Sequence, residues 1–427
     1  MIHYGNITCY TGSDFLLWAA FCAKFSRSRL APMEMWDKEF AHLDKSPAPQ
    51  PNAAAPEKTD KNTTAFLDRI VSDYGDSGVM EGVPVCFFVK NASILLTLLL
   101  TDPRHGWSPL ERSTRRLKME PLTTHGIHSA AHFSAWTAYE TTYDVAIDEL
   151  RREHPMWTAM DIRDTACDTV RDTVPLDGCS PVAITCNVRS LCNFFHNLRR
   201  ERFVGLIADH PVFEELEHLR ADIAQMVLSR YAPFSRKFDT HHDSFIEDSA
   251  TAYVFSTFDD NLEFIHGLHR CLTLSVAKHG KRSNAFPTPT TLYDGGEHPF
   301  DNAIGNPLCH RENRHGDIPI FYETMHVHGE IYSTVSILRE FKRHRTMRCY
   351  DVHINTSPDK VPLLGTHAFW RFTGTLGALM GLIELRTESK AHADIRALAR
   401  SILAKLSAKY PGYGLLHNSF FFNENCE

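Results

Sequence analysis

The stretch FKRHRT places two arginines and a histidine side by side, as Arg343, His344 and Arg345. Guanidinium groups bind phosphate in a bidentate manner and stack on flat rings, so this triplet could form an anion site or a planar-ligand site. The alternative interpretation is a solvated helix end, because cations near a helix C-terminus interact favourably with the helix dipole. The triplet follows an apolar-patterned run, IYSTVSILREF, and both interpretations remain open.

Two other patterns of polar side chains carry weaker signals. Ser108 to Glu111 reads Ser-Pro-Leu-Glu, which is a capping box with proline at the first helical position and predicts a helix start. The stretches MHVHGE and THHD contain possible metal ligands. No third ligand stands at a diagnostic spacing, so we predict no metal site.

The composition indicates a soluble intracellular protein. A chain of 427 residues is long enough for two or more domains. The net charge of -7 and the pI near 6.4 argue against a dedicated nucleic-acid binder. Eleven cysteines without a C-x-x-C pair favour reduced thiols in the cytoplasm. We see no signal peptide, and the most apolar stretch, ILLTLLLTD, predicts a buried element rather than a membrane span.

The polar clusters are flanked by recognisable secondary structure. Residues 44–62 are rich in proline, alanine and charge and predict a loop insertion, and 279–319 is a longer irregular segment. Apolar extended runs, PVCFFVKNASILL and MHVHGEIYSTVSIL, precede the two basic clusters. Helical periodicity follows at Trp136, Tyr139, Tyr143, Ile147 and Leu150, and again at Ile395, Leu398, Ile402 and Leu406. Strands followed by helices in each half predict an α+β fold.

The two halves resemble each other. TCNVRSLCNFFHNLRRER is followed by HLRADIAQMVLSRYAP, and TGTLGALMGLIELRTES is followed by ADIRALARSILAKLSAKYP. Each pair is an apolar helix ending in Leu-Arg and then an amphipathic helix ending in tyrosine before proline. The ordered pairs predict a tandem duplication, with a first repeat over 1–240 and a second, diverged repeat over 241–427.

The order of these motifs resembles that of the flavin-dependent thymidylate synthases. The family order is Arg-His-Arg, S-x-N-E-x-S-x-R, A-R-x-x-L-P and then N-A-R-S-L-x-N-F-L-x-L-R. The first half contains RHGWSPLERSTRR, VRDTVPLDG and NVRSLCNFFHNLRR, and the second half contains an intact RHR followed by TMRCYDVHIN. The resemblance covers most of 70–411. It implies two tandem thymidylate synthase-like repeats, each with an antiparallel sheet and helices.

In the first half, the resemblance implies a nucleotide-binding run and a flavin-binding helix. The matches to the nucleotide-binding run and the phosphate-binding arginine are Ser108, Glu111, Ser113, Arg115 and Arg171. The matches to the flavin-binding helix are Asn187, Arg189 and Asn193. Arg199 follows with one extra residue before it and is a candidate for the arginine that faces the pyrimidine. Gly106 stands where a second arginine of Arg-His-Arg is expected.

The second half is complementary. Arg343, His344 and Arg345 match the flavin contacts, and Arg386 stands at the family spacing of the pyrimidine-facing arginine. The serines and glutamate of the nucleotide-binding run are missing, and Gly377 replaces a polar flavin-binding residue. In the family the nucleotide site is shared between subunits. The resemblance therefore implies one composite site built from both halves, with Arg386 or Arg199 as the catalytic arginine.

General chemistry indicates what a methylation of this kind requires of the protein. Methylation of a uracil ring at C5 needs that carbon to become nucleophilic, and a guanidinium can hold the negative charge that develops on O2 and N3. The resemblance implies FAD, NADPH and methylenetetrahydrofolate as cofactors, and UMP or dUMP as the small-molecule substrate. Relatives in polyoxin-type antibiotic pathways methylate UMP. Because the family is usually a homotetramer, a chain with two repeats is expected to form a homodimer.

Two other functions remain open. NPLCHRE (306–312) is similar to the Pro-Cys-His nucleophile of the cysteine-dependent thymidylate synthases, although it has an inserted leucine. The chain could also be a non-catalytic protein that binds nucleotide or flavin. Bound flavin in the purified protein would separate these functions from a flavin-dependent methylase.

Overall fold

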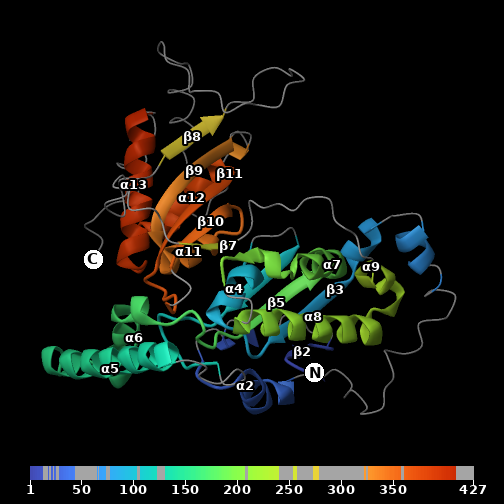
Figure 1. Cartoon of the computed structure of the whole chain (residues 1–427), viewed down its shortest axis with the longest axis horizontal. Helices are drawn as coiled ribbons and strands as arrows, with labels where there is room; N and C mark the ends of the chain where they lie inside the picture. The colour runs from blue at the N-terminus through green and yellow to red at the C-terminus, as the bar shows by residue number, and fades with distance from the viewer. Residues whose placement is uncertain are drawn as a thin grey trace, which may run out of the picture. The chain divides into compact units, whose positions relative to one another are not determined.

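The chain forms two units, which are drawn in Figure 1 and described here from a computed structural model. The first unit comprises Met1–Phe255 with Thr356–Gly365, and the second comprises Ser256–Asn355 with Thr366–Glu427. The prediction from the sequence was a division between residues 240 and 241. The structure describes residues 1–12, 18, 21–22, 24–25, 28–43, 65, 67–73, 77–102, 106–122, 130–206, 210–239, 253–256, 273–277, 322–323, 326–356 and 360–409. The predicted insertion at 44–62 and the irregular segment at 279–319 lie outside these residues.

The first unit is built on an antiparallel sheet. Its strands are β1 (Ile2–Tyr4), β2 (Ile7–Cys9), β3 (Pro84–Val89), β4 (Trp107–Glu111) and β5 (Val182–Asn187). They are ordered β1-β2-β3-β5-β4, so β4 is an edge strand. β5 lies between β3 and β4, with Asn187 opposite Pro84 and Cys186 opposite Trp107. This central strand runs directly into α7 (Val188–Asn197) and thereby fixes where that helix begins.

An aromatic cluster covers one face of this sheet. Trp36 and Phe40, from α2 (Pro32–Glu39) and its C-terminal end, pack with Phe21 at ring-centroid distances of 5.3 and 5.6 Å. The cluster buries Phe88 of β3 completely, and Ala183 of β5 lies in it as well. Each buried aromatic side chain removes about 150–250 Å² from water, so this layer is a main source of stability for the first unit.

Helices cover the opposite face. Trp107 of β4 packs against Phe194 of α7 at 4.5 Å between ring centroids and against Phe87 of β3 at 6.2 Å. α4 (Ile94–Leu100) is buried along its whole length and contacts α8 (Pro211–Arg230). The prediction of a buried element at ILLTLLL is therefore confirmed. The prediction that PVCFFVKNASILL is extended is wrong after β3, because Ser93 caps α4 by accepting a hydrogen bond from the Leu96 N–H at 2.9 Å.

Glu215 on α8 gives the first unit a pH-dependent stability. Its carboxylate accepts a hydrogen bond from the Ser93 N–H at 2.7 Å, but burial raises its pKa from 4.5 to about 7. Asp177 and Glu214 raise this pKa further. Between pH 4.5 and about 7, the Glu215 carboxyl group is ionised in the unfolded chain but protonated in the folded chain. The free energy of unfolding should therefore fall by about 3 kcal/mol as the pH rises from about 4.5 to 7.

Denaturant unfolding across this pH range tests the prediction. The variant Glu215→Gln should lose this part of the pH dependence. Glu214→Gln is the matched control, because Glu214 is adjacent and 62% exposed, and it should keep the slope. Equal slopes in wild type and Glu215→Gln would contradict a buried, protonated Glu215.

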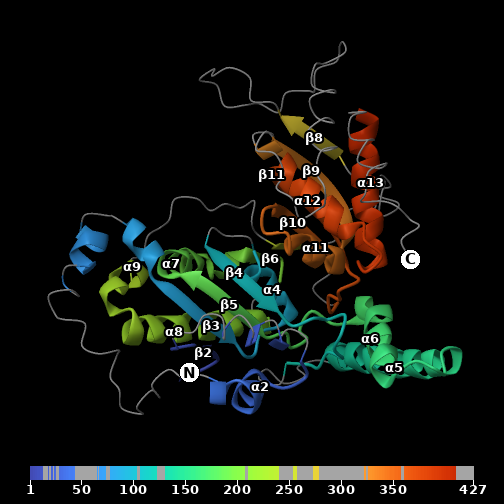
Figure 2. The same cartoon turned by 180° about the vertical axis from the view of Figure 1, so that it is seen from behind.

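A helical pair projects from the first unit, visible from both sides in Figures 1 and 2. α5 (Ala130–Glu153) buries Trp136, Tyr139, Tyr143 and Ile147, which confirms the helix predicted from their periodicity. α6 (Ala159–Thr169) begins with a capping box from Thr158 and packs along α5. The short elements of this unit are η1 (Ala41–Leu43), η2 (Arg69–Asp73), η3 (Ser77–Gly82), η5 (Arg171–Thr173), η6 (Arg200–Arg202), β6 (Phe203–Val204), η7 (Ala232–Phe234), α9 (Arg236–Asp239) and β7 (Tyr253–Ser256).

The second unit contains an antiparallel sheet with the strand order β10-β11-β9-β8. Its strands are β8 (Thr273–Ala277), β9 (His326–Thr334), β10 (Arg348–Asn355) and β11 (His367–Thr375). Its helices are α11 (Val335–Lys342), α12 (Leu376–Arg386) and α13 (Ala393–Lys409). The periodic residues Ile395, Leu398, Ile402 and Leu406 are buried on α13, as predicted. The run MHVHGEIYSTVSIL is strand only as far as Thr334 and helical afterwards.

The two units share an order of elements. The first contains β3, α4, β4, β5, α7 and α8, and the second contains β9, α11, β10, β11, α12 and α13. In each, the strand before the last two helices is central and its two neighbours are antiparallel to it. Asn187 and Thr375 end these central strands and cap the helices that follow, each accepting from the N–H three residues later. The fold is therefore a mixed α and β fold with antiparallel sheets and helices.

Two further findings concern the predicted elements. Ser108–Glu111 is strand β4 and not a helix start, so that prediction is wrong. The edge position explains the strand, because an edge strand tolerates Pro109, whose missing N–H breaks no ladder on the open side. None of the helices in the described part of the chain is long and apolar enough to cross a membrane.

Candidate functional site

The start of α7 holds the first group of predicted flavin-binding residues. Asn187 is the N-cap of this helix, and its side-chain oxygen accepts a hydrogen bond from the Ser190 N–H at 2.8 Å. Gly106 has a φ of +66°, and a Cβ added there would lie 2.6 Å from Asn187 Nδ2 and 2.7 Å from Ser190 Oγ. The family arginine that is absent at position 106 therefore has neither the backbone conformation nor the space that it needs.

Gly106→Ala should destabilise the protein by about 2–3 kcal/mol. A left-handed backbone conformation costs an alanine about 1–2 kcal/mol, and displacement of the Asn187 cap adds about 1 kcal/mol. Gly82→Ala is the matched control, because nothing lies within 4 Å of its added Cβ. Thermal or denaturant unfolding measures both variants, and equal stabilities would show that Gly106 has no such constraint.

Arg189 and Asn193 lie one helical turn apart on α7 and are both exposed. Arg189 Nη1 forms an ion pair with Glu81 Oε1 at 2.6 Å, and both side chains remain more than two-fifths exposed. Exposed ion pairs contribute little to stability, so a ligand could displace Glu81 at small cost. The structure thus brings these two predicted flavin-binding residues onto one accessible face of α7.

The predicted nucleotide-binding run follows the edge strand. Ser108 lies opposite Thr185 of β5 and is half-buried, while Glu111 at the end of the strand is buried. Ser113 lies two residues past the strand and is half-buried. The alternation along β4 places Ser108 on the face opposite Trp107 and Glu111. The strand therefore separates the run, with Ser108 on one face and Glu111 on the other.

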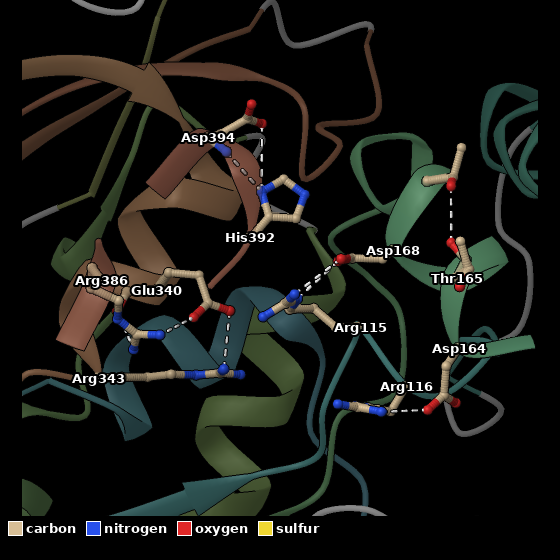
Figure 3. Close-up of polar contacts among 11 residues, drawn as sticks. Arg115, Arg116, Asp164, Thr165, Asp168, Glu340, Arg343, Arg386, His392 and Asp394 are labelled. Atoms are coloured by element: carbon tan, nitrogen blue, oxygen red, sulfur yellow. Dashed lines mark hydrogen bonds and ion pairs between the residues drawn. The ribbon is translucent and has the colours of Figure 1, made fainter. Parts of the chain in front are cut away.

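Arg115 and Arg116 each pair with an aspartate of α6, as Figure 3 shows. Arg115 donates from Nε and Nη2 to the two oxygens of Asp168 at 2.8 and 3.0 Å, in bidentate geometry. Arg116 pairs with Asp164 at 2.6 Å, and its side chain is 61% exposed. Asp168 was not predicted from the sequence, since a partner 53 residues away leaves no local signal. The fifth predicted substrate residue, Arg171, is only 1% exposed in η5.

In the second unit, the predicted arginines gather around a residue that the sequence analysis missed. Glu340 of α11 is 1% exposed and pairs with Arg343 Nη1 at 2.9 Å and with Arg386 Nη1 at 3.2 Å. Figure 3 shows both guanidinium groups directed at its carboxylate. The signal that could have found it is the spacing, since Glu340 stands three residues before Arg343.

His344 lies in the same group. Arg386 Nε donates a hydrogen bond to His344 Nε2 at 2.8 Å. Burial, and then the positive charge of Arg386, lower the pKa of His344 to about 3, while Glu340 acts in the opposite direction. His344 is therefore a neutral imidazole at neutral pH. The structure brings together His344, Arg343 and Arg386, and it leaves Arg345 exposed beside them.

The helix ends explain the offset at Arg199. Arg343 is the C-cap of α11 and Arg386 is the last residue of α12, so the interpretation of FKRHRT as a helix end is confirmed. α7 ends at Asn197, and buried Leu198 follows as its C-cap. Arg199 thus lies past the helix, where its Nε donates to the His196 carbonyl at 2.8 Å.

Thiol and metal chemistry find no support among the described residues. No group of three or more histidine, cysteine, aspartate or glutamate residues in this part of the chain could hold a metal ion. Burial raises the pKa of Cys86 to about 12 and that of Cys179 to about 11, so these thiols are not activated nucleophiles. The cysteine of NPLCHRE lies outside the described residues.

Comparison with known proteins shows what the chain is similar to. A curated relative, a UPF0159 protein of Chlamydia pneumoniae, is 33% identical over 96 residues, which span 22% of this chain and 18% of the relative. The structural neighbours include a UMP/dUMP methylase, PolB from Streptomyces cacaoi, in two crystal structures. With 5-Br UMP bound, the TM-score is 0.26, the identity 18% and the coverage 41% of this chain and 84% of PolB. With 5-Br dUMP bound, the TM-score is 0.27, the identity 16% and the coverage 54% of this chain and 93% of PolB.

The family model of the thymidylate synthase complementing proteins, Thy1, matches residues 19–203. This range contains the strand β4, Arg115, Arg171 and the whole of α7. The resemblance inferred from the sequence is therefore confirmed over this range, where the chain is similar to the thymidylate synthase complementing proteins.

Proposed function

We propose that the chain is a flavin-dependent methylase that transfers a one-carbon unit to C5 of a uridine 5′-monophosphate. The observation that carries the proposal is the family match over 19–203, which includes the residues matched to nucleotide and flavin binding. The substrate is UMP or dUMP, and the other cofactors are NADPH and methylenetetrahydrofolate. These finer assignments rest on the motif resemblance.

The chemistry of the side chains fits a flavin. Arg189 and Asn193 present a guanidinium and an amide on one exposed face of α7, and Arg343 and Arg345 are exposed at the end of α11. Guanidinium and amide N–H groups are donors that suit the carbonyl oxygens and the pyrophosphate of FAD. When bound, reduced flavin would supply the electrons for the reductive methylation.

The remaining residues hold the nucleotide. Ser113 and Arg115 would donate to the 5′-phosphate, with Arg115 already in a geometry that suits bidentate binding of an oxyanion. Arg199 or Arg386 would hold the negative charge that develops on O2 and N3 of the pyrimidine. Arg171 is enclosed in the first unit, so a phosphate contact by this residue requires a local opening.

A tandem duplication accounts for the division of these residues between two units. Three observations support it: the shared order of elements, the same central strand, and caps at the equivalent positions Asn187 and Thr375. We infer a homodimer that binds two flavins. Light scattering combined with flavin stoichiometry tests this, and one flavin per repeat would contradict it.

The decisive experiment starts with the absorbance of the purified full-length chain, before and after incubation with FAD. The chain is then supplied with FAD, NADPH, methylenetetrahydrofolate and either UMP or dUMP, and the product is analysed by mass spectrometry. A methylated nucleotide is expected. A flavin-loaded protein that turns over neither nucleotide would rule out the methylase, and a protein that binds no FAD would favour a flavin-independent function.

Two variants test the proposed flavin-binding residues. Arg189→Ala in the first unit and Arg345→Ala in the second should each lower flavin occupancy, because each removes a proposed donor to the cofactor. Full flavin occupancy in both variants would contradict flavin binding by these two arginines.

A further inference from the structure

Three side chains of the second unit form a relay that ends at His344. Glu340 is 1% exposed, and its Oε2 lies 3.2 Å from Nη1 of Arg386, which is itself 13% exposed. Arg386 Nη2 donates to the Glu340 carbonyl at 3.3 Å, and Arg386 Nε donates to His344 Nε2 at 2.8 Å. Arg386 is therefore anchored on Glu340 at two points and meets His344 with its remaining face. Figure 3 shows the ion pair between Arg386 and Glu340.

The hydrogen bond from Arg386 determines which nitrogen of His344 carries the proton. A guanidinium nitrogen only donates, so Nε2 of His344 must be an acceptor. In a neutral imidazole the proton then resides on Nδ1. Nδ1 makes no hydrogen bond to the side chains that the structure describes, and it thus leaves a donor at the end of α11.

We propose that Arg386, held by Glu340, is a positioning residue that locks His344 as the neutral tautomer with its proton on Nδ1. This role differs from a contact with the pyrimidine, and it makes Arg199 the remaining candidate for that contact. The charged groups that act on His344 are Arg386 from α12 and Glu340 from α11, the helix that precedes His344. Protonation of His344 would place a second positive charge against Arg386, and burial opposes that charge as well.

The consequence for the cofactor rests on the proposed function. A flavin ring presents carbonyl oxygens and ring nitrogens that accept hydrogen bonds. A neutral His344 would donate to one of them from Nδ1 without adding a charge, while Arg343 and Arg345 supply the positive charge. The relay would therefore keep hydrogen bonding and charge on separate residues of the Arg-His-Arg triplet.

Nitrogen NMR of the full-length chain, labelled at histidine and studied without added flavin, tests the tautomer. His344→Gln assigns the signal by its disappearance. In the wild type we expect a protonated Nδ1 and an unprotonated Nε2 that do not titrate between about pH 5 and 8, the range where an ordinary histidine changes charge. A proton on Nε2, or an ordinary titration, would overturn the proposal.

Variants separate the relay from burial alone. Arg386→Met removes the donor and the charge, so His344 should lose its fixed tautomer and titrate in that range. Arg386→Lys should restore the Nδ1 tautomer, because an ammonium also only donates. Arg371→Met is the matched control, since Arg371 pairs with Glu330 and Asp351 on the sheet of the same unit and should leave the His344 signals unchanged. An unchanged tautomer in Arg386→Met would contradict the relay.

FAD titration supplies a second readout. Arg386→Met should weaken FAD binding by about tenfold, as loss of one well-placed hydrogen bond does, and Arg386→Lys should recover most of it. Because the NMR measurement needs no flavin, a locked His344 in a chain that binds no FAD would contradict the proposed function and leave the relay intact. An unlocked His344 in a chain that binds FAD would overturn the relay alone.

Discussion

Glu340→Leu is expected to destabilise the second unit by about 3–5 kcal/mol, one of the largest effects of a single substitution in this chain. Removing one partner of a buried ion pair leaves the other charge uncompensated. Glu340 is 1% exposed and Arg386 is 13% exposed, so the guanidinium cannot be rehydrated without disturbing α11 and α12. Arg343, at 32% exposed, can turn towards water and should contribute less to the loss.

The control is a pair of the same chemistry on the sheet of the same unit. Glu330 pairs with Arg371 at 2.8 Å, but these side chains are 39% and 41% exposed. Glu330→Leu should therefore change stability by no more than about 1 kcal/mol. Denaturant unfolding followed by a probe in the second unit measures both variants. The double variant Glu340→Leu/Arg386→Met should recover much of the loss, because it removes both charges. Equal effects of Glu340→Leu and Glu330→Leu would contradict a buried network.

Local patterns predicted the helices well because helix contacts lie within a few residues of one another. The periodic apolar residues of α5 and α13 mark the buried sides of those helices. The order of the strands in the sheet could not be predicted from local patterns, because β5 pairs with β3 and β4, which lie far from it in the sequence. The Ser-Pro-Leu-Glu pattern gave a wrong prediction of a helix start for the same reason. Its capping-box chemistry is local, whereas pairing of β4 with β5 is not, and the tertiary pairing prevailed.

The candidate site shows the same limit. Motif order placed Arg189, Arg343 and His344 among the site residues, but it gave no partner for any of them. Arg189 pairs with Glu81, which is 108 residues away in the sequence. Arg343 pairs with Glu340 of α11, and His344 accepts a hydrogen bond from Arg386 of α12. The carboxylates that pair with these arginines are set by the fold rather than by the order of motifs along the chain.

Arg115→Ala should raise the KM for a uridine 5′-monophosphate by about 10- to 100-fold and leave kcat nearly unchanged. Hydrogen bonds to a charged group contribute about 1.5–3 kcal/mol, and a phosphate contact made equally in the ground state and the transition state appears in KM alone. Asp168 would remain without its arginine near the phosphate and would add repulsion to the loss.

Arg116→Ala is the matched control for Arg115→Ala. Both arginines lie on the same loop and pair with aspartates one turn apart on α6, but Arg116 is 61% exposed and Arg115 is 23% exposed. If the charge of the loop alone attracted the nucleotide, the two variants would be equally affected. A dedicated phosphate contact by Arg115 predicts a change in KM of less than threefold for Arg116→Ala, since an exposed pair is worth about 0–1 kcal/mol.

Calorimetric measurement of UMP and uridine binding tests the role of Arg115 without turnover. Arg115→Ala should weaken the binding of UMP and leave that of uridine unchanged, because only UMP carries the phosphate, and equal losses for both ligands would move Arg115 away from the phosphate.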